Sequence, residues 1–380
     1  FELFYYESKE SYTHIGPLKI INVKQEYTDS EHQKYRVRDL MEDLFYSLGE
    51  NEFCSIGQTQ EYYDTLKQKF PNKYLSILWA LKDCAIFSFI EDNFEKHPFF
   101  HSLIRENSVE RILRKEKYII DNRKISSCYR FSYEFSPKYA EEPIHIEFSF
   151  DINSAFQQRV FAIIGENGVG KTQLITALPL DLAKRRENLF APQVPLYSKV
   201  IAVSTSLYDS FDVPKNSVGF NYVYCGLACG KKDNKTILAP KELKLKLLQT
   251  IKTINGRERA ESLKNILSPL YSADIISALF TIQEEKIKVN QARLVEIVDY
   301  MSSGESSLLF IFCNIVANIR YDSLILFDEP ETHLHPNAIT SLMSSIYQLL
   351  DEYQSYAIIV THSPLIIREM RSTGVRIMDR

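Results

Sequence analysis

A glycine-rich turn between a short apolar strand and a helix constrains this chain more than any other sequence feature. The strand is predicted over residues 160–164 and the helix over residues 173–178. The eight residues between them match the pattern G-x-x-x-x-G-K-[ST] and are Gly165, Glu166, Asn167, Gly168, Val169, Gly170, Lys171 and Thr172. Because the chain has only 12 glycines, a chance match of the four fixed positions is expected in roughly a few chains per thousand. The turn therefore predicts a strand–loop–helix unit of an α/β fold.

The residue types in this turn suit the binding of a triphosphate. Glycines let the backbone N–H groups point inward around phosphate oxygens, and the N-terminus of the following helix adds partial positive charge. Lys171 would contact the β- and γ-phosphates of ATP, and the Thr172 hydroxyl would bind Mg²⁺. We therefore expect ATP and Mg²⁺ as the cofactors of this chain.

Two carboxylates follow a second apolar segment, which predicts a buried strand over residues 323–327. Asp328 would hold the metal, directly or through water, and Glu329 would orient or deprotonate the water that attacks the phosphate. Taken alone, the pair could also be carboxylates that form a turn. The phosphate-binding turn in the same chain favours the catalytic interpretation.

Two further segments carry polar residues at the ends of predicted elements. A helix predicted over residues 306–318 is preceded by Ser302, Ser303, Gly304 and Glu305. These residue types predict a helix cap, and a capped helix start also exposes N–H groups and hydroxyls that bind anions. His362 follows a strand predicted over residues 357–360, a position where a lone histidine is usually structural. It would lie beside the γ-phosphate if this strand neighbours the one that ends at Asp328.

The order of these segments resembles that of ATPases of the ATP-binding-cassette (ABC) type. The similarity is greatest to soluble members such as SMC, RecF, OLD-family and PtuA-like proteins. Residues 328–336 resemble the corresponding segment of RecF, OLD and PtuA proteins. Transporters differ, because they usually carry a Thr-Ser-Ala-Leu-Asp-like segment there. Met301, Ser303 and Glu305 depart from the transporter signature Leu-Ser-Gly-Gly-Gln. A Ser-x-Gly-Glu form is typical of the SMC and RecF group.

The resemblance implies an α/β fold with an ABC-ATPase-type P-loop sheet core and helical insertions. The core would comprise residues 1–33, 123–205 and 300–380. A helical insertion would occupy residues 34–122, and a mostly helical arm or insertion would occupy residues 206–299.

The resemblance also implies an enzyme that hydrolyses ATP to ADP and phosphate as a homodimer or higher even oligomer. Two subunits would face head to tail, so that residues 302–305 of one cap the γ-phosphate held by Lys171 of the other. His362 would sense the γ-phosphate, and residues 334–336 would lie at the dimer seam.

The most similar systems are anti-phage defence ATPases of the PtuA kind, in Septu or retron loci, which act with a separate HNH nuclease (PtuB-like). The resemblance thus implies a cytoplasmic ATPase whose dimer closure regulates a DNA-targeting complex, with DNA or a retron nucleic acid as a further partner. Two alternatives are a RecF-like DNA repair ATPase and a nucleotide-gated scaffold with little turnover. The intact hydrolytic residue types favour hydrolysis.

Composition excludes several other classes of protein. A net charge of −4 excludes a strongly basic protein that coats nucleic acid. No apolar run approaches the roughly 18–20 residues that cross a bilayer, so no membrane partner is expected. Six cysteines in 380 residues are too sparse for a disulfide scaffold and indicate reduced thiols, as in the cytoplasm.

Some patterns leave their role open. Residues 231–290 hold twelve Lys or Arg against seven Asp or Glu, and with the basic residues 184–186 they could contact a phosphate backbone or simply form a solvated face. Cys225 and Cys229 lack a second cysteine pair, so a zinc site is not expected. Residues 204–209 contain no glutamine for the metal contact of the family. The candidates for stacking on adenine are Tyr133, Phe135 and Tyr139.

Overall fold

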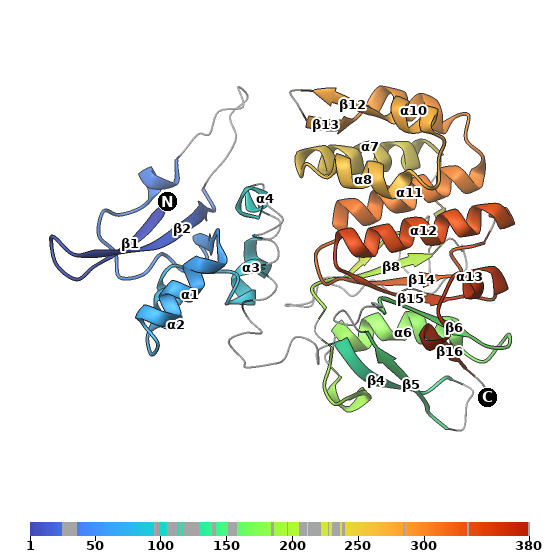
Figure 1. Ribbon diagram of the computed structural model, residues 1–380, viewed down its shortest axis with the longest axis horizontal. Helices are drawn as coiled ribbons and strands as arrows, with labels where there is room; N and C mark the ends of the chain where they lie inside the picture. Colours follow the sequence, from blue (N-terminus) through green and yellow to red (C-terminus); the bar gives the residue numbers. More distant parts are fainter. Residues whose placement is uncertain are drawn as a thin grey trace. The chain divides into compact units, whose positions relative to one another are not determined.

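The computed structural model divides the chain into two compact units, Phe1–Lys124 and Ile125–Arg380, both drawn in Figure 1. Each unit has its own hydrophobic core and is described by itself. The structure describes residues 1–24, 36–94, 97, 99–104, 109, 112–113, 116, 129–138, 142–150, 158–183, 186–195, 197–204, 211, 222–226, 228–229, 236–237, 240–283, 286–332 and 334–378.

The first unit is built on an antiparallel sheet with the strand order β1-β2-β3. The strands are β1 (Glu2–Tyr6), β2 (Tyr12–Asn22) and β3 (Phe53–Gly57). The helices are η1 (Val37–Leu40), α1 (Gln60–Lys69), α2 (Tyr74–Ala80), α3 (Ser88–Phe94) and α4 (Phe100–Leu103). Tyr62 and Leu66 of α1 are buried in one core with Leu18 and Ile56 of the sheet.

The expected domain boundaries are wrong at the N-terminus. Residues 1–33 were expected in the ATPase core, but β2 pairs with β1 and β3 and, among the described strands, not with any strand of the second unit. The described part of residues 1–33 therefore belongs with residues 34–122, which also supply the strand β3. The physical reason is that the apolar face of β2 is covered by α1, which follows closely in the chain.

A carboxyl group lies buried in the core of the first unit. Asp83 accepts hydrogen bonds from the Tyr63 hydroxyl at 2.8 Å and from the backbone N–H groups of Ala85 at 2.9 Å and Ile86 at 3.2 Å. Burial disfavours the charged carboxylate and raises the pKa of Asp83 from 3.8 to about 7, although these hydrogen bonds act in the opposite direction.

We expect the first unit to lose stability as the pH rises from about 4 to about 7. Because the folded-state pKa of Asp83 is raised, the stability contributed by its protonated carboxyl is fully present below about pH 4 and is lost as the pH rises through about 7. Urea unfolding followed by the fluorescence of Trp79, the single tryptophan, measures this loss. The unfolding free energy of wild type minus that of Asp83→Asn should fall by about 4 kcal/mol between about pH 4 and pH 8. A difference that does not change with pH would contradict the prediction.

The second unit contains a parallel sheet with the strand order β16-β6-β15-β14-β8-β9. Its strands are β6 (Val160–Ile164), β8 (Val200–Ser204), β9 (Tyr222–Tyr224), β14 (Leu324–Asp328), β15 (Tyr356–Val360) and β16 (Val375–Ile377). The predicted α/β fold with a parallel sheet and flanking helices is confirmed. The strand predicted over residues 160–164 coincides with β6.

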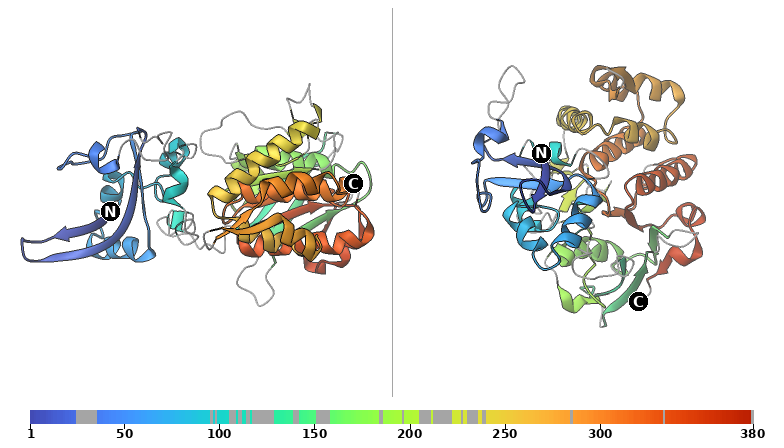
Figure 2. Two further views of the ribbon diagram at one scale, coloured as in Figure 1. Left: turned by 90° about the horizontal axis from the view of Figure 1, so that it is seen from above. Right: turned by 60° about the vertical axis from the view of Figure 1, so that its left-hand side comes forward.

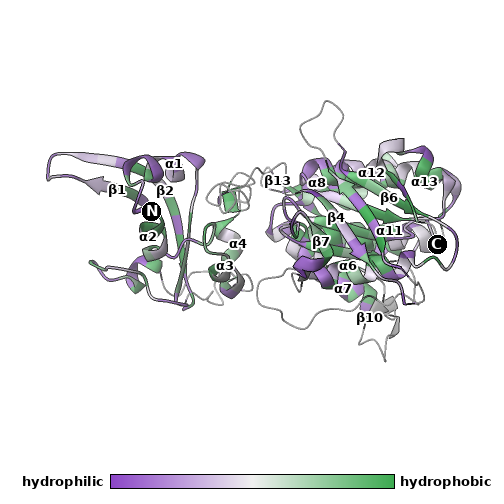
Figure 3. Cartoon of the chain, turned by 90° about the horizontal axis from the view of Figure 1, so that it is seen from below, coloured by the Kyte–Doolittle hydropathy of each residue, from purple (hydrophilic) through white to green (hydrophobic). Residues whose placement is uncertain are grey.

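The two faces of this sheet belong to two separate cores. Ile325 and Phe327 of β14 pack with α11 (Ser303–Asn318) and α12 (Pro336–Glu352). Leu324 and Leu326 pack with α6 (Lys171–Ala183) and an antiparallel sheet of β5 (Ile144–Ser149), β4 (Arg130–Phe135) and β7 (Phe190–Ala191). The helices α11 and α12 thus cover one face and α6 the other, as Figures 1 and 2 show. Because both faces are buried, the strands are continuously apolar, which Figure 3 shows by colour.

The helices between residues 240 and 298 pack on the face that carries α11. They are α7 (Pro240–Gly256), α8 (Ala260–Leu267), α9 (Ala273–Leu279) and α10 (Gln291–Val298), with a hairpin of β12 (Phe280–Gln283) and β13 (Lys286–Val289). Arg257 donates to the carbonyl of Ala317 at 2.6 Å, and Arg259 donates to those of Val316 at 2.9 Å and Ile319 at 2.7 Å. These two arginines of the basic segment therefore satisfy carbonyls at the C-terminal end of α11, where positive charge is favourable.

Shorter elements complete the described part of the second unit. They are η3 (Glu187–Leu189), β10 (Ala228–Cys229), β11 (Thr236–Ile237), α13 (Pro364–Arg368) and η4 (Ser372–Gly374). None of the helices in the described ranges has both the length and the apolar composition of a membrane span.

Candidate active site

The phosphate loop connects β6 to α6, and tight packing explains its glycines. A Cβ atom on Gly165 would lie 2.2 Å from the carbonyl oxygen of Met378, which is too close for any side chain. Gly168 and Gly170 have φ values of +85° and +101°, a region that side chains rarely adopt. The helix begins at Lys171, two residues before the predicted start. Close approach at the first glycine and positive φ at the other two therefore require the glycine pattern.

Lys171 connects the loop to the carboxylates. Its ammonium group donates to the carbonyls of Gly165 at 2.9 Å and Glu166 at 2.7 Å. Burial lowers the pKa of Lys171, while the charges of Glu329 and Asp328 act to raise it. Both carboxylates are therefore within electrostatic reach of the lysine that would contact the phosphates.

The strand register brings the remaining residues to the same edge of the sheet. Asp328 pairs with Val360 on one side and with Ser204 on the other, and Val360 pairs with Ile163 of β6. Neighbouring strands lie about 4.8 Å apart. The phosphate loop, the carboxylate pair and His362 therefore all follow the carboxyl ends of adjacent strands, the edge where open α/β sheets bind ligands.

Glu329 is held in an unusual backbone conformation beside His362. Its φ is +46°, in the left-handed region that a residue with a Cβ adopts only at a cost of about 1–3 kcal/mol. Its backbone N–H donates to the carbonyl of Val360 at 2.9 Å. Its Oε1 lies 3.4 Å from Nε2 of His362. The structure thus brings together the two residues that the sequence suggested for catalysis.

Thr172 and Asp328 fit the magnesium ion expected with a triphosphate. They contribute a hydroxyl and a carboxylate, and hard oxygen ligands are those that Mg²⁺ prefers. Within the described ranges, no cluster of three or more His, Cys, Asp or Glu side chains could hold a metal. Phosphate oxygens and water would supply the other ligands, and the ion would neutralise phosphate charge.

The serine–glycine segment forms the cap of α11. Ser302 is the N-cap residue, and its Oγ accepts from the backbone N–H of Glu305 at 3.3 Å, while Glu305 Oε2 accepts from the Ser302 N–H at 2.9 Å. This reciprocal pair is a capping box. Ser302, Ser303 and Glu305 are exposed and Gly304 is partly buried. Because α11 and α6 cover opposite faces of the sheet, this segment and the phosphate-loop helix of the same chain begin on different faces.

The aromatic residues considered for adenine stacking and the basic residues 184–186 are described only in part. Tyr133 is fully buried, stacks on Phe190 and donates to Asp181 at 2.6 Å, and Phe135 is also buried, so both serve the core. Arg186 forms an ion pair with Asp181 at 2.9 Å. Several residues named from the sequence lie outside the described residues, namely Tyr139, Lys184, Arg185 and residues 205–209.

Sequence reasoning missed the role of one side chain close to this site. The segment 328–336 predicts no contact between Glu331 and β15, but Oε1 of Glu331 accepts from the Thr361 hydroxyl and from the backbone N–H of His362. Glu331 and Thr361 are 30 residues apart in the chain, so no local pattern indicates the contact.

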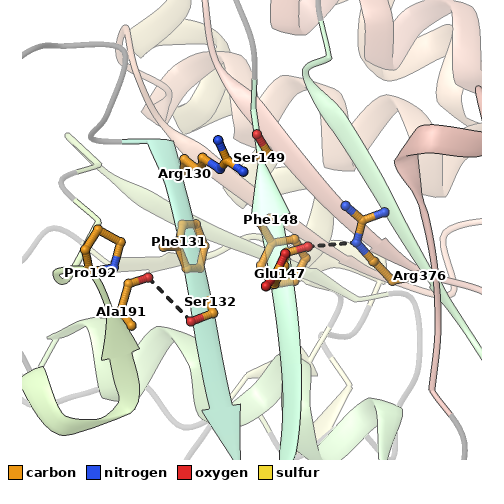
Figure 4. A pocket seen from close by; sticks show the side chains of 9 residues that line it. All are labelled: Arg130, Phe131, Ser132, Glu147, Phe148, Ser149, Ala191, Pro192 and Arg376. Carbon is orange, nitrogen blue, oxygen red and sulfur yellow. Dashed lines mark hydrogen bonds between the residues drawn. The ribbon is translucent and has the colours of Figure 1, made fainter.

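A cavity of about 620 Å³ lies on the antiparallel sheet, as Figure 4 shows. Charged groups of both signs line it, among them Arg130, Glu147 and Arg376. Arg376 donates to the backbone carbonyl of Glu147 at 2.7 Å, and its guanidinium lies 4.6 Å from the centroid of the Phe161 ring. The described residues that line the cavity do not include the phosphate loop, the carboxylate pair or His362. The cavity is therefore distinct from the candidate active site.

Comparison with known proteins finds one family model and one relative that are similar in sequence to this chain. Residues 180–368 match the family model described as "AAA domain, putative AbiEii toxin, Type IV TA system". This range includes the capped segment, the carboxylate pair and His362, and it begins just after the phosphate loop. The protein ea59 of Escherichia phage lambda is 25% identical over 354 residues, which cover 84% of this chain and 67% of that protein.

Two solved structures are similar over part of the chain. One is an ATP-binding cassette of an ABC transporter in its ADP conformation, with 13% identity, a TM-score of 0.33 and coverage of 66% of this chain and 86% of that one. The other is cbiO1 from Clostridium perfringens, part of the ABC transporter complex cbiONQ, with 16% identity, a TM-score of 0.34 and coverage of 66% and 85%. Both superpositions are partial, and the α/β fold described here rests on the strand order and register of the parallel sheet.

Proposed function

We propose that this chain hydrolyses ATP at sites that two copies complete together. The observation that carries the proposal is the convergence of Lys171, Glu329 and His362 at one edge of the parallel sheet. Glu329 would deprotonate or orient the attacking water, because its carboxylate stands one residue beyond the end of β14. Lys171 would hold the β- and γ-phosphates, and His362 would orient the Glu329 carboxylate and contact the γ-phosphate.

The positions of α6 and α11 support a site shared between two copies. A capped helix start offers N–H groups and hydroxyls to an anion, but residues 302–305 include no lysine that could hold the phosphates. Within one chain the sheet separates the helix α11 from the phosphate-loop helix. We therefore propose that residues 302–305 cap the γ-phosphate bound by Lys171 of a second copy, in a head-to-tail dimer. Residues 334–336, where His335 caps α12, would lie at the dimer seam.

Mixing two inactive variants tests this arrangement. Gly304→Asp should fold, because Asp is favourable in the first turn of a helix, but its charge should repel the γ-phosphate in the partner's site. Lys171→Ala and Gly304→Asp should each be inactive alone. Mixed in equal amounts they should recover about a quarter of the wild-type ATPase rate, since half of the dimers pair unlike chains and keep one intact site of two.

A matched mixture provides the control. Lys171 and Glu329 act in the same site of the same chain, so a mixture of Lys171→Ala with Glu329→Gln should recover no activity. Equal recovery in both mixtures, or recovery in neither, would contradict the shared site.

At the cellular level, we propose that dimer closure regulates a DNA-targeting complex of anti-phage defence, with a separate HNH nuclease and with DNA or a retron nucleic acid. The similarity to a phage lambda protein supports a link to phage biology. A gene for an HNH nuclease or a reverse transcriptase beside this one would support defence. Neighbouring replication genes would favour the RecF-like alternative.

A further inference from the structure

The carboxylate of Glu331 joins the turn after β14 to the end of β15. Its Oε1 accepts two hydrogen bonds, one from the Thr361 hydroxyl and one from the backbone N–H of His362 at 3.3 Å. Its Oε2 is buried, and within the described part of the chain no hydrogen-bond partner is found for it. A carboxylate can accept several hydrogen bonds, so both contacts are made by one charged group.

Hydrogen bonds hold both the side chain and the backbone of Thr361. It is fully buried, its hydroxyl donates to Glu331, and the same oxygen accepts from the backbone N–H of Ser363 at 2.9 Å. Its backbone N–H donates to the carbonyl of Ile163 in β6 at 3.2 Å. The peptide groups on both sides of His362 are therefore anchored, one by Glu331 directly and one through Thr361.

The anchored residue is the one that contacts the proposed base. His362 is exposed, and its Nε2 lies 3.4 Å from Oε1 of Glu329. Hydrogen bonds to the peptide groups beside His362 fix the position from which its imidazole projects, and catalytic groups need a fixed supporting shell. Glu329 and Glu331 belong to the same turn, in which the N–H of Thr332 donates to the carbonyl of Glu329 at 3.1 Å. A shift of Glu331 would therefore move both sides of the contact between Glu329 and His362.

We propose that Glu331 is a positioning residue, which acts through Thr361 and the backbone of His362 to hold the imidazole against Glu329. The inference rests on the proposed function, because it assigns Glu331 to the same hydrolytic site. Glu331 does not touch the phosphates in this role, so its loss should affect turnover and leave ATP binding nearly unchanged.

Steady-state kinetics of the full chain test whether loss of Glu331 lowers turnover without weakening ATP binding. Glu331→Ala and Thr361→Val should each lower kcat about tenfold or more, with the KM for ATP changed by less than about threefold. Thr361→Ser keeps the hydroxyl and should retain kcat within about twofold. The matched control is Thr340→Val, which removes a threonine hydroxyl that donates to another glutamate, Glu369, at 3.2 Å on the surface. In a His362→Ala background, Glu331→Ala should have no further effect on kcat.

A spectroscopic measurement separates this inference from the proposed function. The ring signals of the eight histidines can be followed by NMR of histidine-labelled protein, and the His362→Ala spectrum identifies those of His362. Glu331→Ala should shift or broaden the His362 signals, whereas Thr340→Val should not. If Glu331→Ala changes neither the His362 signals nor kcat, the inference is overturned. The proposed ATPase function would still be supported in that case, provided that the wild type hydrolyses ATP and that this activity depends on Glu329. A wild type without ATPase activity would overturn the proposed function, and the NMR result would then decide the positioning role alone.

Discussion

Replacing Lys171 with alanine is expected to weaken ATP binding by about 100-fold or more and to abolish hydrolysis. The ammonium group of Lys171, at the start of α6, donates hydrogen bonds to two carbonyls of the loop. The charges of Asp328 and Glu329 act on it electrostatically. Charge-assisted hydrogen bonds between a lysine and phosphate oxygens are among the stronger hydrogen bonds in proteins, especially where the lysine is partly buried. Titration with a fluorescent ATP analogue measures the affinity, and phosphate release measures hydrolysis.

A second lysine separates this effect from a general loss of positive charge. Lys286 is exposed on β13 and pairs with Glu258 at 2.7 Å, so Lys286→Ala should bind ATP like the wild type. Because the variant at position 171 also removes the hydrogen bonds to Gly165 and Glu166, its thermal unfolding midpoint should be measured beside the affinity. Wild-type ATP affinity in a folded Lys171→Ala protein would exclude the phosphate loop as the nucleotide site.

Replacing Glu329 with glutamine is expected to lower the rate of ATP hydrolysis by about 10²–10⁴-fold and to leave ATP binding intact. Glutamine has nearly the same shape, can keep the contact with His362 and leaves Lys171 in place, but it cannot accept a proton from water. In the proposed mechanism hydrolysis opens the dimer, so the variant should also accumulate as a dimer when ATP and Mg²⁺ are added. Phosphate release and light scattering after size-exclusion chromatography measure the two effects.

The control for this variant is an exposed glutamate with a similar local partner. Glu296 pairs with Arg293 on α10 at 2.8 Å, and Glu296→Gln should leave turnover unchanged. If the wild type hydrolyses ATP no faster than Glu329→Gln at saturating ATP, the nucleotide-gated scaffold becomes the better interpretation. Dimer formation on ATP addition would then still be expected.

Local sequence predicted much of the second unit because its elements carry their signals within a few residues. The apolar run of β6 and the glycine pattern that follows specify a strand, a tight turn and a helix start without reference to the rest of the chain. The same holds for Ser302 and Glu305, whose three-residue spacing forms the capping box.

Local sequence patterns did not predict which distant segments of the chain contact each other. Residues 1–33 were assigned to the wrong unit, because an apolar strand such as β2 can pair with any sheet that buries its face. Arg257 and Arg259 looked like surface charge, but they reach carbonyls of α11 about 60 residues away in the chain.

By itself, the sequence determined the backbone conformations and residue types of the phosphate loop, the strand that ends at Asp328 and the cap at Ser302, since each depends on neighbouring residues. Only the tertiary structure decided that Glu331 binds Thr361, that His362 lies against Glu329 and that β2 belongs to the first unit. The physical reason is that these contacts join residues many positions apart, and their geometry exists only once the strands have aligned in register.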